Sequence, residues 1–150
     1  MNLSATSSTT PTSRPVPVVS TALPSPASLR AAGQAAAARG EPLVVMTTLA
    51  GCPYCDLVRN HHLLPLRREG LVHAVQIDIR DRTSNLQGFD GENTTPAEQA
   101  RRWKARFAPT VLFLGPDGRE LAERLVGVAV PDFYGEYLDA RLATARKALK

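Results

Sequence analysis

Apolar and polar positions along the chain fall into runs of different spacing, and each spacing predicts a different element. A continuous apolar, β-branched run over residues 42–49 is typical of a buried central strand. Residues 71–79 alternate apolar with polar side chains, which predicts a second strand. Residues 110–114 and 119–126 predict two more strands, and the turn sequence Gly-Pro-Asp-Gly between them indicates a hairpin.

Helices are predicted where these strand patterns stop. Residues 29–39 are alanine-rich and are followed by Gly40, a natural helix terminator. Residues 53–68 form the second predicted helix, because a proline is tolerated in the first helical turn and Gly70 ends the pattern. Pro65 lies inside this helix, and we expect it to bend the axis.

Two more helices follow a polar stretch at residues 80–93 that predicts a loop. Residues 95–98 (Thr-Pro-Ala-Glu) match a capping box with proline at the first helical position. They predict a helix that runs to about Phe107. The last helix is predicted from Pro131 to about Leu149. Its inward-facing side chains are expected to be Phe133, Tyr137, Leu138 and Leu142.

The order of these elements predicts the fold class. A βαβ unit followed by a ββα unit gives an α/β fold with a mixed four-stranded sheet and helices on both faces. We expect this domain over residues 29–150. Residues 1–28 are rich in Ser, Thr and Pro and carry a single charged side chain, so they predict a disordered leader or tether. Their apolar stretch is too short and too interrupted by proline for a convincing secretory signal.

Composition and charge argue against several classes of function. The chain has 150 residues, of which 43% are hydrophobic, which is enough for one domain with one core. Its net charge of +4 is spread out, and no Lys/Arg run interleaved with aromatics predicts nucleic-acid binding. No apolar stretch approaches the roughly 18 residues that span a bilayer. We therefore expect neither a nucleic-acid partner nor stable membrane insertion, and we expect a monomer.

Cys52 and Cys55 are the only cysteines, and they follow a strand and a glycine directly at a predicted helix start. A disulfide between them closes so small a loop that it adds little stability, so a purely structural role is a poor explanation. Unpaired N–H groups at a helix start favour a thiolate, which is the nucleophile in thiol–disulfide exchange. Cys52 is therefore the predicted attacking residue. Cys55, one turn on, is predicted to resolve the mixed disulfide.

Three alternatives use the same cysteines. Zinc could be held with His61, His62 or His73, although the spacing fits no common finger pattern. Covalent haem attachment needs a histidine directly after Cys55, where the chain has Asp56, and an iron–sulfur cluster needs more cysteines. We expect no metal and no cofactor. His61 and His62 are expected to be a pair on the helix surface rather than a catalytic base.

Pro109 is the second candidate feature, because it stands directly before the third predicted strand. A proline in this place is a candidate for a cis peptide bond. An ordinary trans proline is the alternative, and the order of elements favours the cis form.

From about Glu41 to Leu149 the chain resembles the thioredoxin superfamily. The resemblance rests on the strand leading into Cys-Pro-Tyr-Cys and a helix, on Ala108-Pro109 before a strand, on the Gly-Pro-Asp-Gly hairpin and on the closing helix. It implies a cis Pro109 packed against the dithiol. It also implies that the backbone of Ala108 binds an extended substrate, as in β-strand recognition, with Pro53 and Tyr54 beside it.

Two subfamilies are matched only in part. Cys-Pro-Tyr-Cys looks like glutaredoxin, but the segments around Pro109 and Gly127 lack the glutathione-holding pattern, so glutathione is not the expected partner. Classical thioredoxins carry Trp where this chain has Gly51, a buried Asp at the place of Met46 and a Lys at the place of Ala74. The resemblance therefore implies that Cys55 has no built-in base.

The nearest resemblance is to periplasmic thioredoxin-like proteins of sulfur oxidation and cytochrome maturation. It rests on the Gly-Cys-x-x-Cys segment, the polar insertion, an Arg-rich helix before Pro109 and Asp132-Phe133 at the last helix. It implies a thiol–disulfide oxidoreductase that acts on a protein partner as reductant and is itself served by an upstream reductase. The expected compartment is the periplasm, with the cytoplasm as alternative. The alternative function is a redox switch or binding module without turnover, and a small metal-binding domain is a third.

Overall fold

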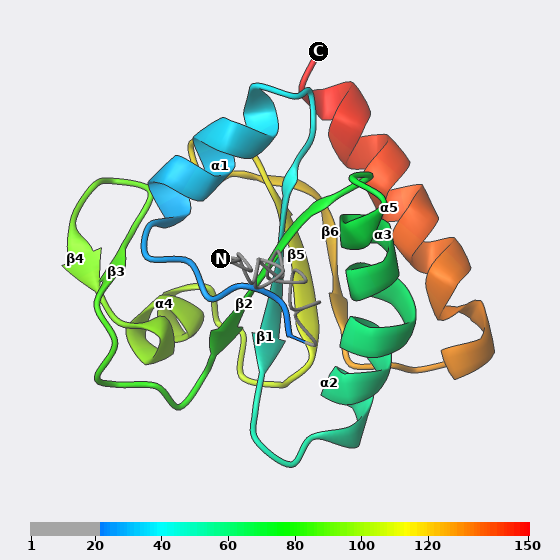
Figure 1. Ribbon diagram of the computed structural model, residues 1–150, viewed down its shortest axis with the longest axis horizontal. Helices are drawn as coiled ribbons and strands as arrows, with labels where there is room; N and C mark the ends of the chain where they lie inside the picture. Colours follow the sequence, from blue (N-terminus) through cyan, green and yellow to red (C-terminus); the bar gives the residue numbers. More distant parts are fainter. Residues whose placement is uncertain (1–21) are drawn as a thin grey trace, which may run out of the picture.

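The fold is built around a four-stranded sheet in the order β2-β1-β5-β6 (Figure 1). The computed structural model describes residues 22–150. Its strands are β1 (Leu43–Thr48), β2 (His73–Asp78), β5 (Thr110–Leu114) and β6 (Glu120–Val126). β1 pairs with β2 in parallel and with β5 antiparallel, and β5 pairs with β6 antiparallel. The mixed sheet and the hairpin are therefore confirmed.

Helices cover both faces of this sheet, as the sequence predicted (Figure 1). One face packs on α1 (Leu29–Ala37) and α4 (Pro96–Arg102). The other packs on α2 (Pro53–Val58), α3 (Leu64–Arg68) and α5 (Tyr134–Ala148). All six residues of β1 are buried, because β1 lies between two strands and between two helical layers. Within residues 22–150, no helix is both long and apolar enough to cross a bilayer.

The second predicted helix is not continuous. A π-helical turn, η1 (Arg59–Leu63), separates α2 from α3. Pro65 has no N–H to donate to the carbonyl one turn earlier, and the N–H of Leu64 reaches back five residues to the carbonyl of Arg59. The expected bend is thus accommodated by a wider turn in the helix.

Two boundaries around α4 differ from the prediction. The stretch predicted as a loop contains a short hairpin of β3 (Leu86–Gln87) and β4 (Asn93–Thr94), and Leu86 is buried in the core. Thr95 caps α4 by accepting the N–H of Glu98, as predicted. The helix ends at Arg102 rather than near Phe107, because Lys104 has a left-handed φ of 57° that a helix does not allow.

The last helix begins later than predicted. A 3₁₀ turn, η2 (Pro131–Phe133), precedes α5. Leu138 and Leu142 are buried as expected, but Phe133 and Tyr137 are exposed and Tyr134 is buried in their place. The assignment of Phe133 and Tyr137 to the core is therefore wrong.

Residues 22–28, which the sequence assigned to the leader, instead pack on the domain. Leu23 is buried in the core, and the carbonyl of Pro24 accepts the N–H of Gln76 in β2. Ser28 caps α1 and also bonds the side chain of Gln87. The domain thus begins several residues before the predicted boundary at residue 29. The rest of the predicted leader lies outside the described residues.

Candidate redox site

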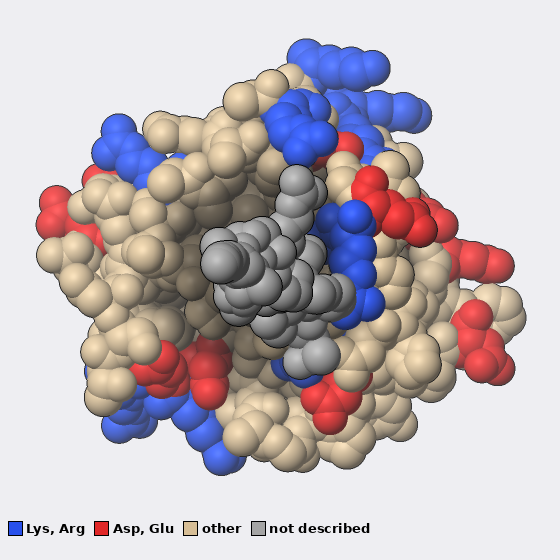
Figure 2. All heavy atoms as spheres, viewed as in Figure 1, with Lys and Arg blue, Asp and Glu red and all other residues tan. Residues whose placement is uncertain are grey.

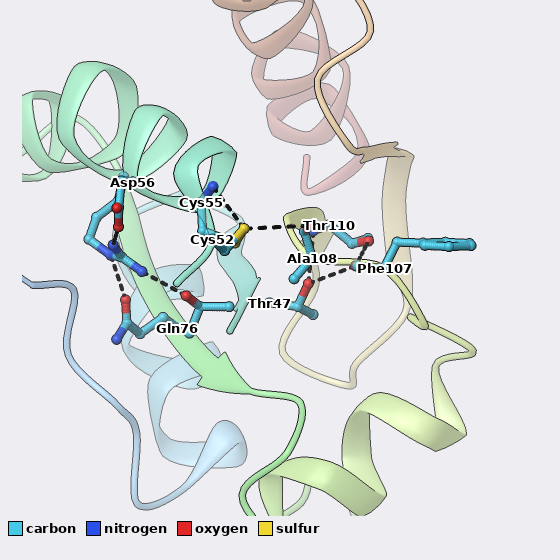
Figure 3. The surroundings of a disulfide bond; sticks show 10 residues. Thr47, Cys52, Cys55, Asp56, Gln76, Phe107, Ala108 and Thr110 are labelled. Carbon is cyan, nitrogen blue, oxygen red and sulfur yellow. Dashed lines mark hydrogen bonds and ion pairs between the residues drawn. A yellow bond between two sulfur atoms is a disulfide. The ribbon is translucent and has the colours of Figure 1, made fainter. Parts of the chain in front are cut away.

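Both cysteines lie at the start of α2, directly after β1 (Figure 3). Gly51 has a φ of 72°, a left-handed conformation that favours glycine, and it turns the chain from β1 into α2. Cys52 and Cys55 are joined by a disulfide, and Cys52 Sγ accepts the backbone N–H of Cys55 at 3.2 Å. Cys52 is partly exposed, whereas Cys55 is fully buried. An incoming sulfur can therefore reach Cys52 and not Cys55.

The segment before β5 forms the other half of the site. The Ala108–Pro109 peptide bond is cis, as predicted. The carbonyl oxygen of Ala108 lies 3.7 Å from Cys52 Sγ (Figure 3). Pro109 is buried, and its carbonyl accepts the N–H of Gly127 at 2.8 Å. The fold thus brings Ala108 and Pro109 to the more accessible of the two sulfurs.

Apolar side chains near the disulfide are exposed. Pro53 and Tyr54, between the two cysteines, both face solvent, and Tyr54 is 53% exposed. Phe107 is 69% exposed, and Val126, paired with Thr110 at the end of β6, is 56% exposed. We call Tyr54, Phe107 and Val126 the apolar rim. Tyr54 follows Cys52 by two residues, and Phe107 and Val126 flank the segment of Ala108 and Pro109, with the Phe107 ring pointing away from Cys52 (Figure 3). Exposed apolar residues around a reactive group are typical of a surface that another molecule covers.

We call the segment that carries Ala108 and Pro109 the proline half of the site. Thr47, near the end of β1, holds this segment in place. Its Oγ1 accepts the N–H of Thr110 at 2.8 Å and donates to the carbonyl of Phe107 at 3.2 Å. Thr110 Oγ1 donates to the same carbonyl at 2.6 Å. Thr47 is fully buried, and its bond with the N–H of Thr110 is buried as well. These hydrogen bonds fix the backbone on both sides of Ala108 and Pro109.

We call the start of α2, which carries Cys52 and Cys55, the helix half of the site. Thr48, the residue after Thr47, holds this half from the opposite face of the sheet. Arg59 donates to Thr48 Oγ1 at 2.7 Å and to Gln76 Oε1 at 2.9 Å. It also pairs with Asp56 at 2.9 Å (Figure 3). The Arg59 side chain is only 12% exposed. A nearly buried guanidinium therefore ties the helix that carries both cysteines to β1 and β2.

The hydrogen bonds of Thr47 and those between Arg59 and Thr48 were not predicted from the sequence. Thr47 and Thr48 have the alternating orientation of strand residues, but their partners are distant in the sequence. Arg59 is one turn after Cys55, inside a helix expected to face the core. A lone cation in that position is the signal that could have indicated a buried ionic contact.

Met46 and Ala74 occupy the places where the resemblance put the missing acid and lysine. Both are buried, and each lies in a β-strand beside the site. Gln76 is directly opposite Met46 in the β1–β2 pair, so Arg59 reaches the sheet face that Met46 occupies. On this face the guanidinium of Arg59 thus contacts the amide of Gln76 and the hydroxyl of Thr48, and its carboxylate partner, Asp56, is an exposed helix residue rather than a strand residue.

The histidines do not join the cysteines. His61 is exposed, and His62 packs against the ring of Tyr134 with centroids 5.1 Å apart. Burial lowers the pKa of His62 below its usual value, with a smaller contribution from His61. His73 lies at the start of β2, the end of the strand away from the disulfide. Among residues 22–150, no group of three or more His, Cys, Asp or Glu side chains is placed to hold a metal ion.

Sequence comparison assigns this arrangement to a family. A family model described as a thioredoxin-like domain matches residues 29–141, and the chain belongs to that family. No protein with curated annotation matches the chain. The family and the Cys52–Cys55 pair together support thiol–disulfide oxidoreductase chemistry in general.

Solved structures show the same fold at low sequence identity. Thioredoxin from Fasciola hepatica is 18% identical, with a TM-score of 0.53 over 79% of this chain and 99% of that one. Thioredoxin NaTrxh from Nicotiana alata is 19% identical, with a TM-score of 0.51 over 82% of this chain and 98% of that one. A protein described as DsbH oxidoreductase is 18% identical, with a TM-score of 0.52 over 98% of this chain and 94% of that one. At such identities the likeness concerns the fold.

Proposed function

We propose that this protein is a thiol–disulfide oxidoreductase that reduces a disulfide of a protein partner. One observation carries the proposal: the accessible sulfur of Cys52 lies beside the Ala108 carbonyl and cis Pro109, while Cys55 is buried behind it. This arrangement offers a nucleophile, a resolving thiol and a strip of backbone for an extended substrate in one place.

In the first step the Cys52 thiolate attacks one sulfur of the partner's disulfide. A bond forms between Cys52 Sγ and that sulfur, and the partner's second sulfur leaves as a thiolate. The N–H of Cys55, which reaches Cys52 Sγ at 3.2 Å, is placed to stabilise negative charge on the attacking sulfur. This contact favours Cys52 as the attacker.

In the second step Cys55 releases the partner. Its thiol gives a proton to water or to the partner's departed thiolate, and its sulfur attacks Cys52 Sγ. The partner's first sulfur leaves, so the partner has gained two electrons and this protein ends as the Cys52–Cys55 disulfide. An upstream dithiol reductase returns the two electrons. Because Met46 and Ala74 are apolar, neither can relay the Cys55 proton.

The partner is held as an added strand. The backbone of Ala108 pairs with the residues that flank the partner's cysteine, and Pro109, Pro53 and Tyr54 contact its side chains. The exposure of Tyr54 supports this role. A protein substrate, rather than a small thiol, is the occupant that matches an open apolar rim. We propose the periplasm as the compartment, with the cytoplasm as the alternative. Cell fractionation shows which compartment holds the protein, and sequencing of its N-terminus shows whether a leader has been removed.

Single-cysteine variants test the assignment of roles. Cys52→Ser should abolish reduction of a protein disulfide such as that of insulin, because no nucleophile remains. Cys55→Ser should instead accumulate a mixed disulfide with its partner, visible as a heavier band that dithiothreitol removes. If Cys52→Ser kept full activity, or if Cys55→Ser alone lost the first step, the roles would be wrong.

The reduction potential of the pair tests the direction. A value near about −270 mV is that of a reductant, and one near about −120 mV is that of an oxidant. Equilibration with glutathione buffers, read by thiol alkylation, gives this value. Rapid alkylation of Cys52 at pH 6, with slow alkylation of Cys55, is expected for a catalyst. Equal and slow labelling of both would indicate a switch or binding module instead.

A further inference from the structure

We infer that a cleft lined by arginines beside the redox site binds an acidic segment of the partner polypeptide, a few residues from its target cysteine. The inference rests on the proposed function, because it names the kind of partner which that site serves. The cleft has a volume of about 870 Å³. Its apolar lining residues are Ile79, Ala97, Ala100 and Ala105, and its charged side chains are Arg80, Arg82, Arg101, Arg106 and Glu98.

The cleft adjoins the substrate-binding backbone. Arg106 is two residues before Ala108, so its Cα lies within about 7 Å of the Ala108 Cα along the chain. The opposite wall starts at Ile79, whose N–H donates to the carbonyl of Thr48 at the end of β1. A peptide that pairs with Ala108 and continues past Phe107 therefore enters the cleft two to four residues from its cysteine.

The walls of the cleft are fixed by the fold. The N–H of Ala97 in α4 donates to the carbonyl of Asp81 at 2.9 Å, which joins the helix to the segment after β2. Arg124 donates to the carbonyl of Trp103 at 2.6 Å and holds the segment that follows α4. The arginines thus project from backbone that is tied down on both sides.

The charge of the cleft is positive and largely uncompensated. Glu98, its acidic side chain, is bonded by Arg101 and also paired with Arg102, and these contacts hold its pKa near 2. Arg80, Arg82 and Arg106 are exposed and form no ion pair within the described part of the chain.

Asp78 and Asp81 are the acids of the segment that carries Arg80 and Arg82, and the carboxylate of Asp78 accepts the N–H of Arg80 at 2.8 Å. The pKa of Asp81 is lowered to about 2 by hydrogen bonds from the side chain and the backbone N–H of Ser84 and, to a smaller extent, from the N–H of Thr83. Figure 2 shows basic side chains at the lower left edge of the molecule, with acidic side chains beside them. Carboxylates of an incoming peptide are the complementary groups.

Peptide substrates with a single disulfide test the inference. Three peptides carry Glu, Gln or Lys at the second and fourth positions on either side of the cysteine, and reduced protein is mixed with each. At low ionic strength the Glu peptide should be reduced about tenfold faster than the Gln peptide, measured as kcat/KM, and the Lys peptide more slowly than either. The ratio of kcat/KM for the Glu peptide to that for the Gln peptide should fall toward one as the salt concentration is raised to about 0.5 M.

Charge reversal locates the effect. In Arg82→Glu/Arg106→Glu the order of the Glu and Lys peptides should invert. The matched control is Arg119→Glu, also exposed, in the β5–β6 hairpin at the opposite end of the sheet. It should keep the wild-type order. Equal rates for all three peptides, or an unchanged order in the double variant, would overturn the inference.

A binding arm separates this inference from the proposed function. A fluorescent Glu peptide without cysteine should bind the oxidised wild-type protein by anisotropy, and the double variant should weaken binding at least fivefold. If no peptide is reduced but this binding is seen, the cleft stands and the reductase proposal fails. If the Gln peptide is reduced but neither preference nor binding is seen, the reverse holds. A dependence on Arg82 and Arg106 found with oxidised glutathione alone would identify a small-molecule site and contradict a polypeptide partner.

Discussion

The two halves of the redox site are held by neighbouring residues of β1 in different ways. Thr47 holds the proline half through two neutral hydrogen bonds, one to the N–H of Thr110 and one to the carbonyl of Phe107, and Thr110 Oγ1 adds a third bond to the same carbonyl. Thr48, on the opposite face, holds the helix half through the guanidinium of Arg59, which extends to exposed Asp56. One strand thus sets the distance between Cys52 and Ala108, because both halves are fastened to its end.

The difference indicates how each half tolerates change. Thr47 accepts the N–H of buried Thr110, so losing this bond leaves an unpaired buried donor. The bonds of Arg59 join side chains, and Asp56 lies in solvent, where an ion pair contributes little. We therefore expect the proline half to be the less tolerant one.

The largest effect is expected for Thr47→Val. The carbonyl of Phe107 keeps Thr110 Oγ1 as donor, but the N–H of Thr110 loses the hydroxyl oxygen that accepts it. The free energy of unfolding should fall by about 2 kcal/mol, and disulfide exchange should slow severalfold as the backbone at Ala108 shifts. Urea unfolding followed by circular dichroism, together with insulin reduction, measures both. Thr47→Ser keeps the hydroxyl and should lose less than half as much; equal losses would show that packing, not hydrogen bonding, is the cause.

A smaller effect is expected for Arg59→Met, which keeps the packing of the stem and removes the guanidinium. Thr48 and Gln76 lose their donor, but the cost of burying a charge disappears at the same time. We expect a loss of about 1 kcal/mol in the free energy of unfolding. Urea unfolding measures it. Arg59→Lys, which retains the charge but not the forked geometry, is the matched control and should recover part of the loss. A loss larger than that of Thr47→Val would reverse the comparison.

The smallest effect is the coupling between the two halves. Thr47 and Arg59 share no hydrogen-bond partner and lie on opposite faces of β1. Combining Thr47→Val with Arg59→Met should therefore give additive losses, with a coupling energy below about 0.5 kcal/mol. A double-mutant cycle of unfolding free energies measures this. A larger coupling would mean that β1 transmits displacement from one half to the other.

Much of the fold could be predicted because its signals are local. The buried run of β1, the Gly-Pro-Asp-Gly turn and the capping box at Thr95 each depend on a few adjacent residues. Cys52, Cys55 and Pro109 were found in the same way, since each stands at the junction of two predicted elements. The β3–β4 hairpin was missed because each of its strands has two residues, with Leu86 as the one buried side chain.

What could not be predicted depends on contacts between distant segments. Arg59 is a helix residue like any other until Thr48 and Gln76 are placed beneath it. The misassigned core face of α5 has a geometric cause: successive helix residues differ by about 100° around the axis. Starting the regular helix at Tyr134 instead of Pro131 changes which aromatic side chain faces the sheet.

The bond between Pro24 and Gln76 has a consequence for self-association. β2 is an edge strand of the sheet, and edge strands expose backbone N–H and C=O groups with which a strand of another molecule can pair. The carbonyl of Pro24 accepts one of these groups, the N–H of Gln76, and the buried side chain of Leu23 fixes the segment beside it. Residues 22–28 thus shield this edge against edge-to-edge pairing between copies of the protein, and a fragment that starts at Leu29 would expose an aggregation-prone edge.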